Sequence, residues 1–487
     1  MTGKKTKGRS VSSRRGQKRT AECKATKSQR RKAPSPPQRF PLTDLGDMQR
    51  LVLEHGDDMR FCAQWKKWLF WDGKRWGVDE TGHVERFAKA TVLTMKGEVD
   101  SIRDEGHGEE LRRHCRHSQS VGSIKAMCEL AKTDRKVIVT TQELDSDLFL
   151  LNCKNGTVDL KTGMLRKHKR EDLLTMITLV EFCRTAECPT FERFLHRIMG
   201  GNAELVRFLQ RCIGYCLTGA VTEKVFFMFL GEGDNGKTTL LEAVRFVLGE
   251  YAGQIPIASL LKKNDNGIPN DIAQLQGKRF VTSSEVPEGR AFDDSFMKYI
   301  TGMGTLQARH LYGEYFEFTP TFKIFIDSNR KPRVAGNDKA MWSRIRVAPF
   351  NTTISEAEKD RNLLNKLKAE APGILAWIVR GCLDWQNDGL RPPQAVTDAT
   401  AEYHTEMDSV TRFLGARCDL APGGKELSAD LYAEYRKYCE EEGATPETNT
   451  TFGKLLGGIN GLESCKIKDS RGWCGIRLRG ERPLPLP

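Results

Sequence analysis

The octet Gly-Glu-Gly-Asp-Asn-Gly-Lys-Thr at residues 231–238 has residue types and spacing suited to phosphate binding. Its glycines let the backbone wrap closely round an anion, so that N–H groups and the N-terminus of a following helix face phosphate oxygens. In this pattern Lys237 is expected to reach the β and γ phosphates, and the Thr238 hydroxyl is expected to bind Mg²⁺. A glycine-rich turn that only matches by chance is the alternative. The predicted ATP-binding residues are Gly231, Glu232, Gly233, Asp234, Asn235, Gly236, Lys237, Thr238 and Thr239.

Three polar residues further along the chain are candidates to complete such a site. Glu285 could orient the water that attacks the γ-phosphate, and it is a second candidate ligand for the metal. Asn329 could sense the γ-phosphate, and Arg344 could act as an arginine finger on the nucleotide of a neighbouring subunit, with Arg346 in reserve. Taken singly, a surface Glu, a turn Asn and a solvated Arg are the ordinary alternatives. Their occurrence in this order after the octet favours the catalytic interpretation.

The segments around these residues are typical of an α/β nucleotide-binding fold. Residues 225–230 are aromatic and apolar, as a buried parallel strand would be, and residues 239–248 have helical apolar spacing. The runs 279–284 and 322–328 predict two more core strands, which end next to Glu285 and Asn329. The candidate site is therefore expected where strands give way to loops and a helix.

With these motifs the chain resembles superfamily III helicases of the phage and plasmid primase-helicase type, a group with viral members. The resemblance implies a P-loop NTPase core of the AAA+-like kind, an α+β N-terminal domain and a C-terminal winged-helix domain. It also implies a hexameric ring that hydrolyses ATP between subunits and moves along single-stranded DNA. The matching motifs lie at residues 71–76, 151–160, 214–219, 231–239, 277–285, 298–302, 308–309, 329–332, 344–345 and 349–350.

The chain departs from the family pattern in three places. Residues 301–304 lack the acid that usually follows two glycines, which puts the role of that loop in doubt. Ser284 stands where many P-loop enzymes have a strand-end Asp that holds Mg²⁺, so metal binding is expected to rest on Thr238, water and Glu285. Finally, the usual Arg-Arg pair is reduced to Ser343-Arg344.

The net charge of +13 is confined to the first forty residues, which hold fourteen lysines and arginines and one acid. The rest of the chain is balanced. This segment is predicted to be a disordered tail that binds nucleic acid, serves as a nuclear address or keeps the protein soluble. Neither a secretory signal nor a membrane span is predicted, because no long apolar run is present. The fourteen cysteines lack paired metal-binding spacing, so reduced thiols in a cytoplasm, most simply that of a bacterial host, are expected, with a structural zinc as the alternative.

The remaining segments predict the domain organisation. Asp72-Gly73 and Asn155-Gly156 predict hairpins, and the tryptophans at 65–76 either anchor a core or stack on bases. Helices are expected at 426–442 and 449–456, followed by a two-stranded wing at 466–479 that either contacts DNA or only packs. The predicted units are a tail at 1–40, an N-terminal domain at 41–185, the ATPase at 186–352, a helical linker at 353–405 and a winged-helix-like domain at 406–487.

Basic side chains on two hairpins are the candidate DNA contacts. A turn and aromatic pattern at 311–316 predicts a hairpin projecting into a ring channel, although salt bridges between subunits are the alternative role for Lys298 and Arg309. The predicted DNA-binding residues are Lys298, Arg309, His310, Lys466, Lys468 and Arg471.

These patterns predict an ATP-dependent DNA helicase for replication of a phage, plasmid or integrated element. The expected cofactors are ATP and Mg²⁺, and the expected partners are single-stranded and duplex DNA, other copies of the chain, and a separate primase or polymerase. Two alternatives stay open: a primase-helicase that also makes primers, and an origin-binding or loader ATPase that does not unwind DNA.

Overall fold

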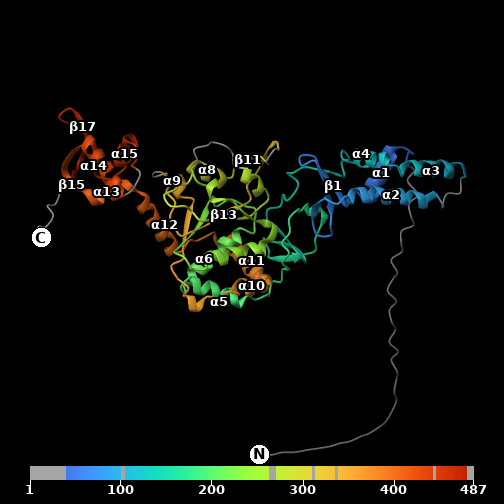
Figure 1. Ribbon diagram of the computed structural model, residues 1–487, viewed down its shortest axis with the longest axis horizontal. Helices are drawn as coiled ribbons and strands as arrows, with labels where there is room; N and C mark the ends of the chain where they lie inside the picture. The colour runs from blue at the N-terminus through green and yellow to red at the C-terminus, as the bar shows by residue number, and fades with distance from the viewer. Residues whose placement is uncertain are drawn as a thin grey trace, which may run out of the picture.

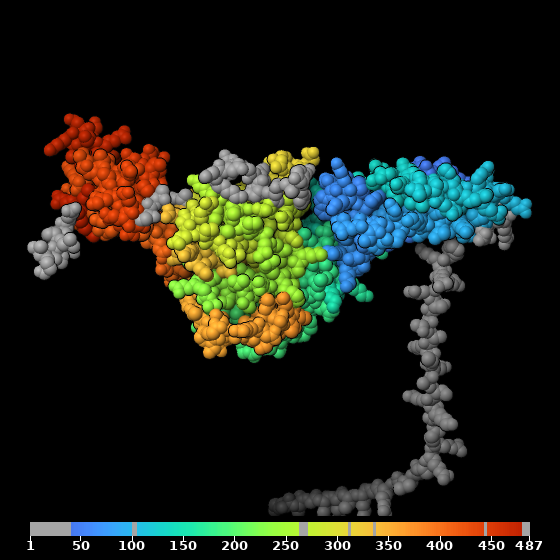
Figure 2. Space-filling view, viewed as in Figure 1, coloured from blue at the N-terminus to red at the C-terminus, as the bar shows by residue number. Residues whose placement is uncertain are grey.

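The described residues form three units in a row. The computed structural model describes residues 40–99, 105–262, 270–309, 313–334, 338–442 and 446–479. A mainly helical unit, a central α/β unit and a C-terminal α/β unit follow one another along the long axis of the molecule (Figures 1 and 2). The predicted tail at residues 1–40 lies almost entirely outside the described residues.

The central unit contains a five-stranded parallel sheet with the strand order β14-β8-β13-β10-β9. All the residues of β13 and the first four of β8 and of β10 are buried, as expected of strands covered on both faces. The chain runs from β8 to the far edge at β9, returns through β10 and β13, and passes β8 to reach β14. The connections that leave the neighbouring strands β8 and β13 therefore run in opposite directions across the sheet. The strand bounds are β8 Phe226–Leu230, β9 Ala252–Gln254, β10 Phe280–Ser284, β13 Lys323–Ser328 and β14 Ile345–Pro349.

Helices from distant parts of the chain close the core of this unit. The α6 and α11 helices approach so closely that a Cβ on Gly214 would stand 2.2 Å from the Cys382 nitrogen. Segment 353–405, predicted as a helical linker, thus supplies α11, which is largely buried in the same hydrophobic core as β8. The helices around the sheet are α5 Pro189–Ile198, α6 Ala203–Tyr215, α7 Lys237–Leu248, α8 Asp294–Ile300, α9 Lys339–Trp342, α10 Leu363–Ala369, α11 Ala371–Asp388 and α12 Gln394–Met407.

The N-terminal unit joins four helices to a small four-stranded sheet. Buried Asp47 on α1 links it to α3, because its carboxylate lies 2.8 Å from His114 Nε2 and accepts a 2.6 Å hydrogen bond from the Ser118 hydroxyl. Trp76 is fully buried, which favours the core role for this member of the tryptophan cluster. The bounds are α1 Asp44–His55, β1 Met59–Cys62, β2 Lys67–Trp71, β3 Trp76–Val78, α2 His83–Val99, α3 Glu105–Ser118, α4 Val121–Ala131 and β4 Ile138–Val139.

Both hairpins predicted from Asp-Gly and Asn-Gly are present, between β2 and β3 and between β5 and β6. The second belongs to a three-stranded sheet whose residues Leu151 and Val158 pack in the core of the central unit. A further hairpin joins β11 to β12, at the place where a projecting hairpin was predicted. The bounds are β5 Leu150–Cys153, β6 Gly156–Asp159, β7 Met164–Arg166, β11 Leu306–Arg309 and β12 Tyr315–Phe318, with 3₁₀ turns at Arg170–Asp172, Gly249–Tyr251, Ile257–Ser259, Asn270–Leu275 and Glu356–Glu358.

The C-terminal unit packs three helices against a three-stranded sheet with the order β15-β17-β16. The two helices and the β-hairpin predicted from the sequence are present, and β15 adds a third strand. The winged-helix assignment stays a prediction. The bounds are α13 Ser409–Arg417, β15 Cys418–Leu427, α14 Ser428–Glu441, α15 Asn449–Leu456, β16 Glu463–Ile467 and β17 Ser470–Leu478.

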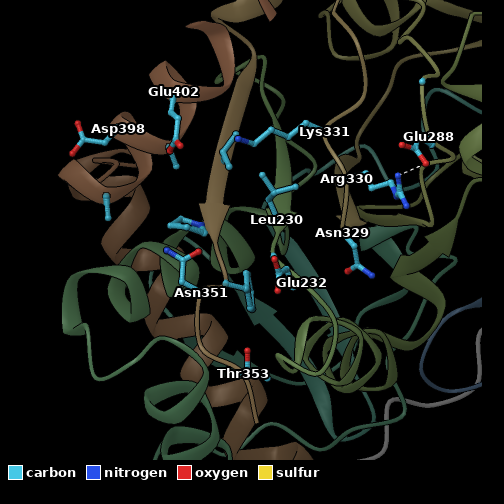
Figure 3. Close-up of a pocket in the computed structure, with 17 residues that line it drawn as sticks. Leu230, Glu232, Glu288, Asn329, Arg330, Lys331, Asn351, Thr353, Asp398 and Glu402 are labelled. Atoms are coloured by element: carbon cyan, nitrogen blue, oxygen red, sulfur yellow. Dashed lines mark ion pairs between the residues drawn. The ribbon is translucent and has the colours of Figure 1, made fainter. Parts of the chain in front are cut away.

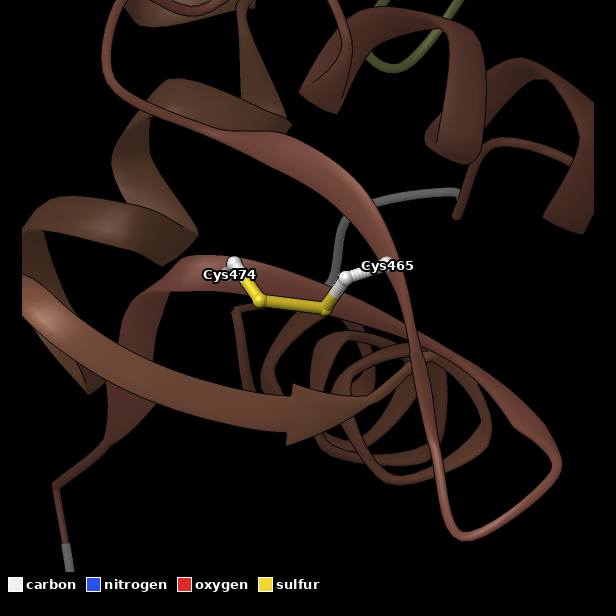
Figure 4. Close-up of a disulfide and its surroundings, with 2 residues drawn as sticks. All are labelled: Cys465 and Cys474. Atoms are coloured by element: carbon white, nitrogen blue, oxygen red, sulfur yellow. A yellow bond between two sulfur atoms is a disulfide. The ribbon is translucent and has the colours of Figure 1, made fainter.

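A disulfide joins Cys465 and Cys474 across the β16–β17 hairpin, with Cα atoms 6.0 Å apart (Figure 4). The prediction of reduced thiols is therefore wrong for this pair. Spacing rules search for cysteines that are close in sequence, whereas antiparallel pairing brings residues nine positions apart into contact. Eleven other cysteines among the described residues are free. No described helix is long and apolar enough to cross a membrane.

Candidate functional site

The octet forms the loop between the carboxyl end of β8 and the first turn of α7, as predicted. Gly236 has φ +79° and leads directly into Lys237, the first residue of α7. A Cβ on Gly236 would stand 2.7 Å from Ile198 Cγ2, and one on Gly231 would stand 2.3 Å from the Phe350 oxygen. These two glycines are therefore required by close packing and, at Gly236, by the left-handed backbone. A Cβ on Gly233 would meet nothing within 4 Å, so packing does not require glycine at this position.

Lys237 is buried at the bottom of this loop. Its ammonium group donates hydrogen bonds to the Gly231 oxygen at 2.8 Å, to Asn235 Oδ1 at 2.8 Å and to Asn329 Oδ1 at 3.0 Å. Burial lowers the pKa of Lys237, and the negative charge of Asp327 opposes that shift. The structure thus brings together Lys237 and Asn329, which are 92 residues apart in the chain.

Asp327, which the sequence analysis did not single out, lies against the Thr238 hydroxyl. Thr238 Oγ1 donates a 2.7 Å hydrogen bond to Asp327 Oδ2, and the other carboxylate oxygen is 3.8 Å from Lys237 Nζ. Burial raises the pKa of Asp327, while Thr238 and Lys237 pull it down. The expected metal ligands were Thr238, water and Glu285, and the structure places a further carboxylate, that of Asp327, against Thr238. The sequence does show an aspartate two residues before Asn329. Its place near Thr238 depends on the sheet order, because β13 lies beside β8 and β10 does not.

Glu285 follows β10 and lies on the same cavity. The Glu285 backbone is in the left-handed region with φ +63°, and its N–H donates to the backbone carbonyl oxygen of Asp327 at 3.2 Å. The cavity has a volume of about 390 Å³ and is lined by the loop, Thr238, Thr239, Glu285, Asp327 and Asn329. We call it the phosphate cavity. Among the described residues that line it, Lys237 is the one cation.

Arg344 is remote from the phosphate cavity of its own chain. It precedes β14, and its carbonyl accepts a hydrogen bond from the Phe226 N–H at 2.9 Å, at the amino end of β8. The octet follows the opposite end of β8, and at about 3.3 Å per residue the five-residue strand separates the two by roughly 13 Å or more. The Arg344 guanidinium donates to the Ala340 oxygen at 2.5 Å. Arg346 is turned to backbone oxygens of Ser343 and Ile345, and burial lowers its pKa.

A larger cavity of about 990 Å³ opens beside Asn329, and we call it the Asn329 cavity (Figure 3). It reaches from the start of the octet to α12. Arg330 forms an ion pair with Glu288, and Lys331 pairs with Glu406 at 2.6 Å. Carboxylates outnumber cations among its lining residues, whose charged members are Glu232, Glu288, Arg330, Lys331, Asp398 and Glu402.

The candidate DNA-binding residues lie on separate features. Lys298 makes an ion pair with Asp338 of the same chain at 2.5 Å, and Arg309 lies over the Tyr315 ring at 5.0 Å, near the tip of the β11–β12 hairpin. His310 lies outside the described residues. The three candidate residues of the predicted wing are exposed on the β16–β17 hairpin, where the cations of Lys466 and Arg471 lie directly opposite each other. These residues are Lys466, Lys468 and Arg471.

Comparison with known proteins finds two family models and several viral relatives. The family model D5 N terminal like matches residues 48–200, and a family of unknown function, DUF5906, matches residues 229–344, which run from the octet to Arg344. "Putative helicase L207/L206" of Acanthamoeba polyphaga mimivirus is 28% identical over 324 residues, covering 61% of this chain and 33% of that protein. "Putative helicase 022R" of Frog virus 3 is 27% identical over 300 residues, covering 57% and 30%.

A third relative, "Putative primase C962R" of African swine fever virus, is 26% identical over 215 residues, covering 42% of this chain and 22% of that protein. The chain therefore matches a third or less of the length of these curated relatives. The solved apo structure of the NrS-1 C terminal region has a TM-score of 0.46 and 12% sequence identity, over 88% of this chain and 98% of that chain.

Proposed function

We propose that this chain, which matches the family model D5 N terminal like over residues 48–200 and is similar to viral proteins named putative helicase or putative primase, is an ATP-dependent DNA helicase of the superfamily III type that acts in replication. The observation that carries the proposal is the meeting of Lys237, Asn329 and the Thr238–Asp327 pair at the carboxyl end of β8. Ligands of open α/β sheets bind at such an edge, where the strand order changes direction.

In this proposal the triphosphate takes over the acceptor positions around Lys237. In the structure the Lys237 ammonium group donates hydrogen bonds to the Gly231 oxygen, Asn235 and Asn329. Phosphate oxygens are stronger partners for a cation, and they would share Lys237 with Asn329, which thereby senses the γ-phosphate. Glu285, on the same cavity, orients the attacking water and accepts its proton.

The donor set also fits Mg²⁺. A hydroxyl and a carboxylate at hydrogen-bonding distance are hard oxygen ligands of the kind this ion takes together with phosphate oxygens and water. Mg²⁺ bound there would neutralise charge on the β and γ phosphates. The Asp327 carboxylate would hold the ion directly or through water. The Thr238 hydroxyl, on α7, would orient that carboxylate through their hydrogen bond.

The proposal assigns Arg344 to the nucleotide of a second copy of the chain. Arg344 lies at the amino end of β14, whereas the phosphate cavity lies at the carboxyl end of the neighbouring strand. A group at one end that completes a site at the other end requires head-to-tail contact, which closes into a ring when the rotation allows it. The Asn329 cavity, with its excess of carboxylates beside the γ-phosphate end, suits the approach of a guanidinium from that copy.

The test is nucleotide hydrolysis and strand displacement by the purified chain, with and without single-stranded DNA. Wild-type protein should hydrolyse ATP faster with DNA and displace an annealed strand. Lys237→Ala should abolish both activities, and Glu285→Gln should bind ATP but not turn it over. Lys89→Ala, an exposed lysine on α2, is the matched control and should behave as wild type. Hydrolysis by Glu285→Gln at the wild-type rate would remove its water-orienting role, and hydrolysis without strand displacement would favour a loader ATPase.

A further inference from the structure

The β16–β17 hairpin carries its cations inside a loop that the disulfide closes. The bond between Cys465 and Cys474 encloses the turn of the hairpin, and we call residues 465–474 the closed loop (Figure 4). The sequence places three cations and a single acid, Asp469, in the closed loop, so it presents a net positive charge to solvent. Its three cations, all exposed, are Lys466, Lys468 and Arg471.

Two features of the closed loop oppose the hairpin conformation. Lys466 and Arg471 lie directly opposite each other on the two strands, where like charges repel. The two residues of the turn, Lys468 and Asp469, have φ +45° and +69°, in the left-handed region that favours glycine. Both features raise the free energy of the hairpin at the position of its cations.

The disulfide ties the weaker strand of the hairpin to the stronger one. The β17 strand pairs with β15 on its other side, and its Trp473 is buried in the core of the C-terminal unit. Within the described part of the chain β16 pairs with β17 alone, and none of its residues is buried. Reduction would leave β16 held by non-covalent contacts alone, against the two opposing features.

Solvent can reach the two cysteines of this bond. Cys465 and Cys474 are half-buried, whereas ten of the eleven free cysteines among the described residues are buried and Cys183 is exposed. Thiol–disulfide exchange needs an accessible sulfur atom. Among the described cysteines, this pair and Cys183 are therefore the ones open to a redox reagent in the folded protein.

We propose that the closed loop binds the phosphate backbone of DNA and that formation of its disulfide strengthens this binding. Closure fixes the three cations in one arrangement before binding, so less conformational entropy is lost when phosphates are bound. In the reduced form the like charges separate and the turn relaxes, and that order must be restored on binding. This inference goes beyond the proposed function, because it concerns DNA binding in the absence of nucleotide.

An external disulfide such as glutathione disulfide supplies the oxidising equivalents. The thiolate of one cysteine attacks a sulfur of the external disulfide, which breaks the external S–S bond and releases one thiolate. The thiolate of the second cysteine then attacks the protein sulfur of the mixed disulfide and releases the other. Two protein thiols become one disulfide, the external disulfide becomes two thiols, and the protons pass to the released thiolates. A dithiol reverses the reaction.

The test measures binding of a labelled DNA duplex to the full chain, without nucleotide, after equilibration with glutathione disulfide or with dithiothreitol. Peptide mapping by mass spectrometry identifies the joined cysteines in each sample. Oxidised protein should bind the duplex about fivefold to twentyfold more tightly than reduced protein at low salt. Thermal unfolding checks that both forms are folded.

Three variants separate the disulfide from other effects of oxidation. The double variant Cys465→Ser/Cys474→Ser should bind with the affinity of reduced wild type under both conditions. Cys183→Ser, which removes an exposed cysteine outside the hairpin, is the matched control and should respond as wild type does. Neutralising the three cations should weaken binding by the oxidised form and remove the response to redox state.

The outcomes are distinct from those that test the helicase. Equal affinities of the oxidised and reduced wild type would overturn this inference, as would free thiols at both positions after equilibration with excess glutathione disulfide. A redox response that persists in the neutralised variant would place the effect outside the closed loop and would also overturn it. Absence of ATP hydrolysis would overturn the proposed function but not this inference, because duplex binding is measured without nucleotide.

Discussion

Replacing Asp327 by Asn tests the residue that only the structure brought into the site. The amide has the same size and keeps an acceptor for the Thr238 hydroxyl, which donates at 2.7 Å. It removes the negative charge that lies 3.8 Å from Lys237 and that would bind Mg²⁺. The perturbation is therefore one of charge, with little change of shape.

The expected size of the effect follows from the interactions that are lost. A hydrogen bond or ligand contact to a charged group contributes about 1.5–3 kcal/mol, and each 1.4 kcal/mol is about tenfold in rate. If these interactions form fully only with Mg²⁺ and the transferring phosphate, Asp327→Asn should lower kcat by roughly 10- to 150-fold. Nucleotide binding in EDTA should change little, because Lys237 and the loop N–H groups remain.

The assay is steady-state phosphate release across a Mg²⁺ titration, with calorimetric nucleotide binding in EDTA. Asp172→Asn, which loses a partly buried ion pair with Arg166 away from the phosphate cavity, is the control and should retain full turnover. Turnover by Asp327→Asn within about threefold of wild type at subsaturating Mg²⁺ would refute the metal-binding role of Asp327.

The raised pKa of Asp327 gives the same variant a pH signature. Protons compete with Mg²⁺ for the carboxylate, so wild-type activity should fall on the acid side at a higher pH than an ordinary aspartate would cause. An acid whose folded pKa is raised favours folding when protonated, and that advantage is lost as pH rises through the raised value. At neutral pH Asp327→Asn should therefore be at least as stable as wild type, and a lower melting temperature would contradict this reading of its burial.

Four further predictions follow from other parts of the molecule. Arg344→Ala should bind ATP yet lose turnover. Mixing it with Lys237→Ala should restore some hydrolysis, at sites where an intact Arg344 from one copy meets an intact octet of another. No recovery of hydrolysis in a mixture that light scattering shows to assemble would argue against a shared site. Gly214→Ala should lower the unfolding free energy by about 1–3 kcal/mol, measured by denaturant titration, because the added methyl meets the α11 backbone. Neutralising Lys466, Lys468 and Arg471 together should make the slope of log K against log salt shallower by up to about 2.7 on duplex DNA, and equal slopes would show that the wing does not touch phosphates. Removing the residues before Phe40 should weaken DNA binding at low salt but spare basal ATP hydrolysis; unchanged DNA binding would leave an address or solubility role for the tail.

Local sequence was enough to predict much of the candidate site. The octet between an apolar run and a helical run predicted a loop from β8 into α7, and the structure has that loop. Runs ending at Glu285 and Asn329 predicted two core strands, and both are present beside it. The two Gly-containing hairpins also formed as expected. These features depend on residues adjacent in the chain, through hydrophobic periodicity and the backbone freedom of glycine.

Long-range strand pairing and packing decided the rest. Asp327 faces Thr238 only because β13 inserts between β8 and β10, an order that no local pattern encodes. Arg344 is kept from its own phosphate cavity by the parallel register of β14 with β8. A cavity beside the octet brings Phe194 of α5 together with residues 354–364. The segment predicted as a helical linker supplies α11, whose close packing at Gly214 places it in the core. Contacts between residues far apart in the chain depend on how whole elements share one core, and that is a property of the folded molecule.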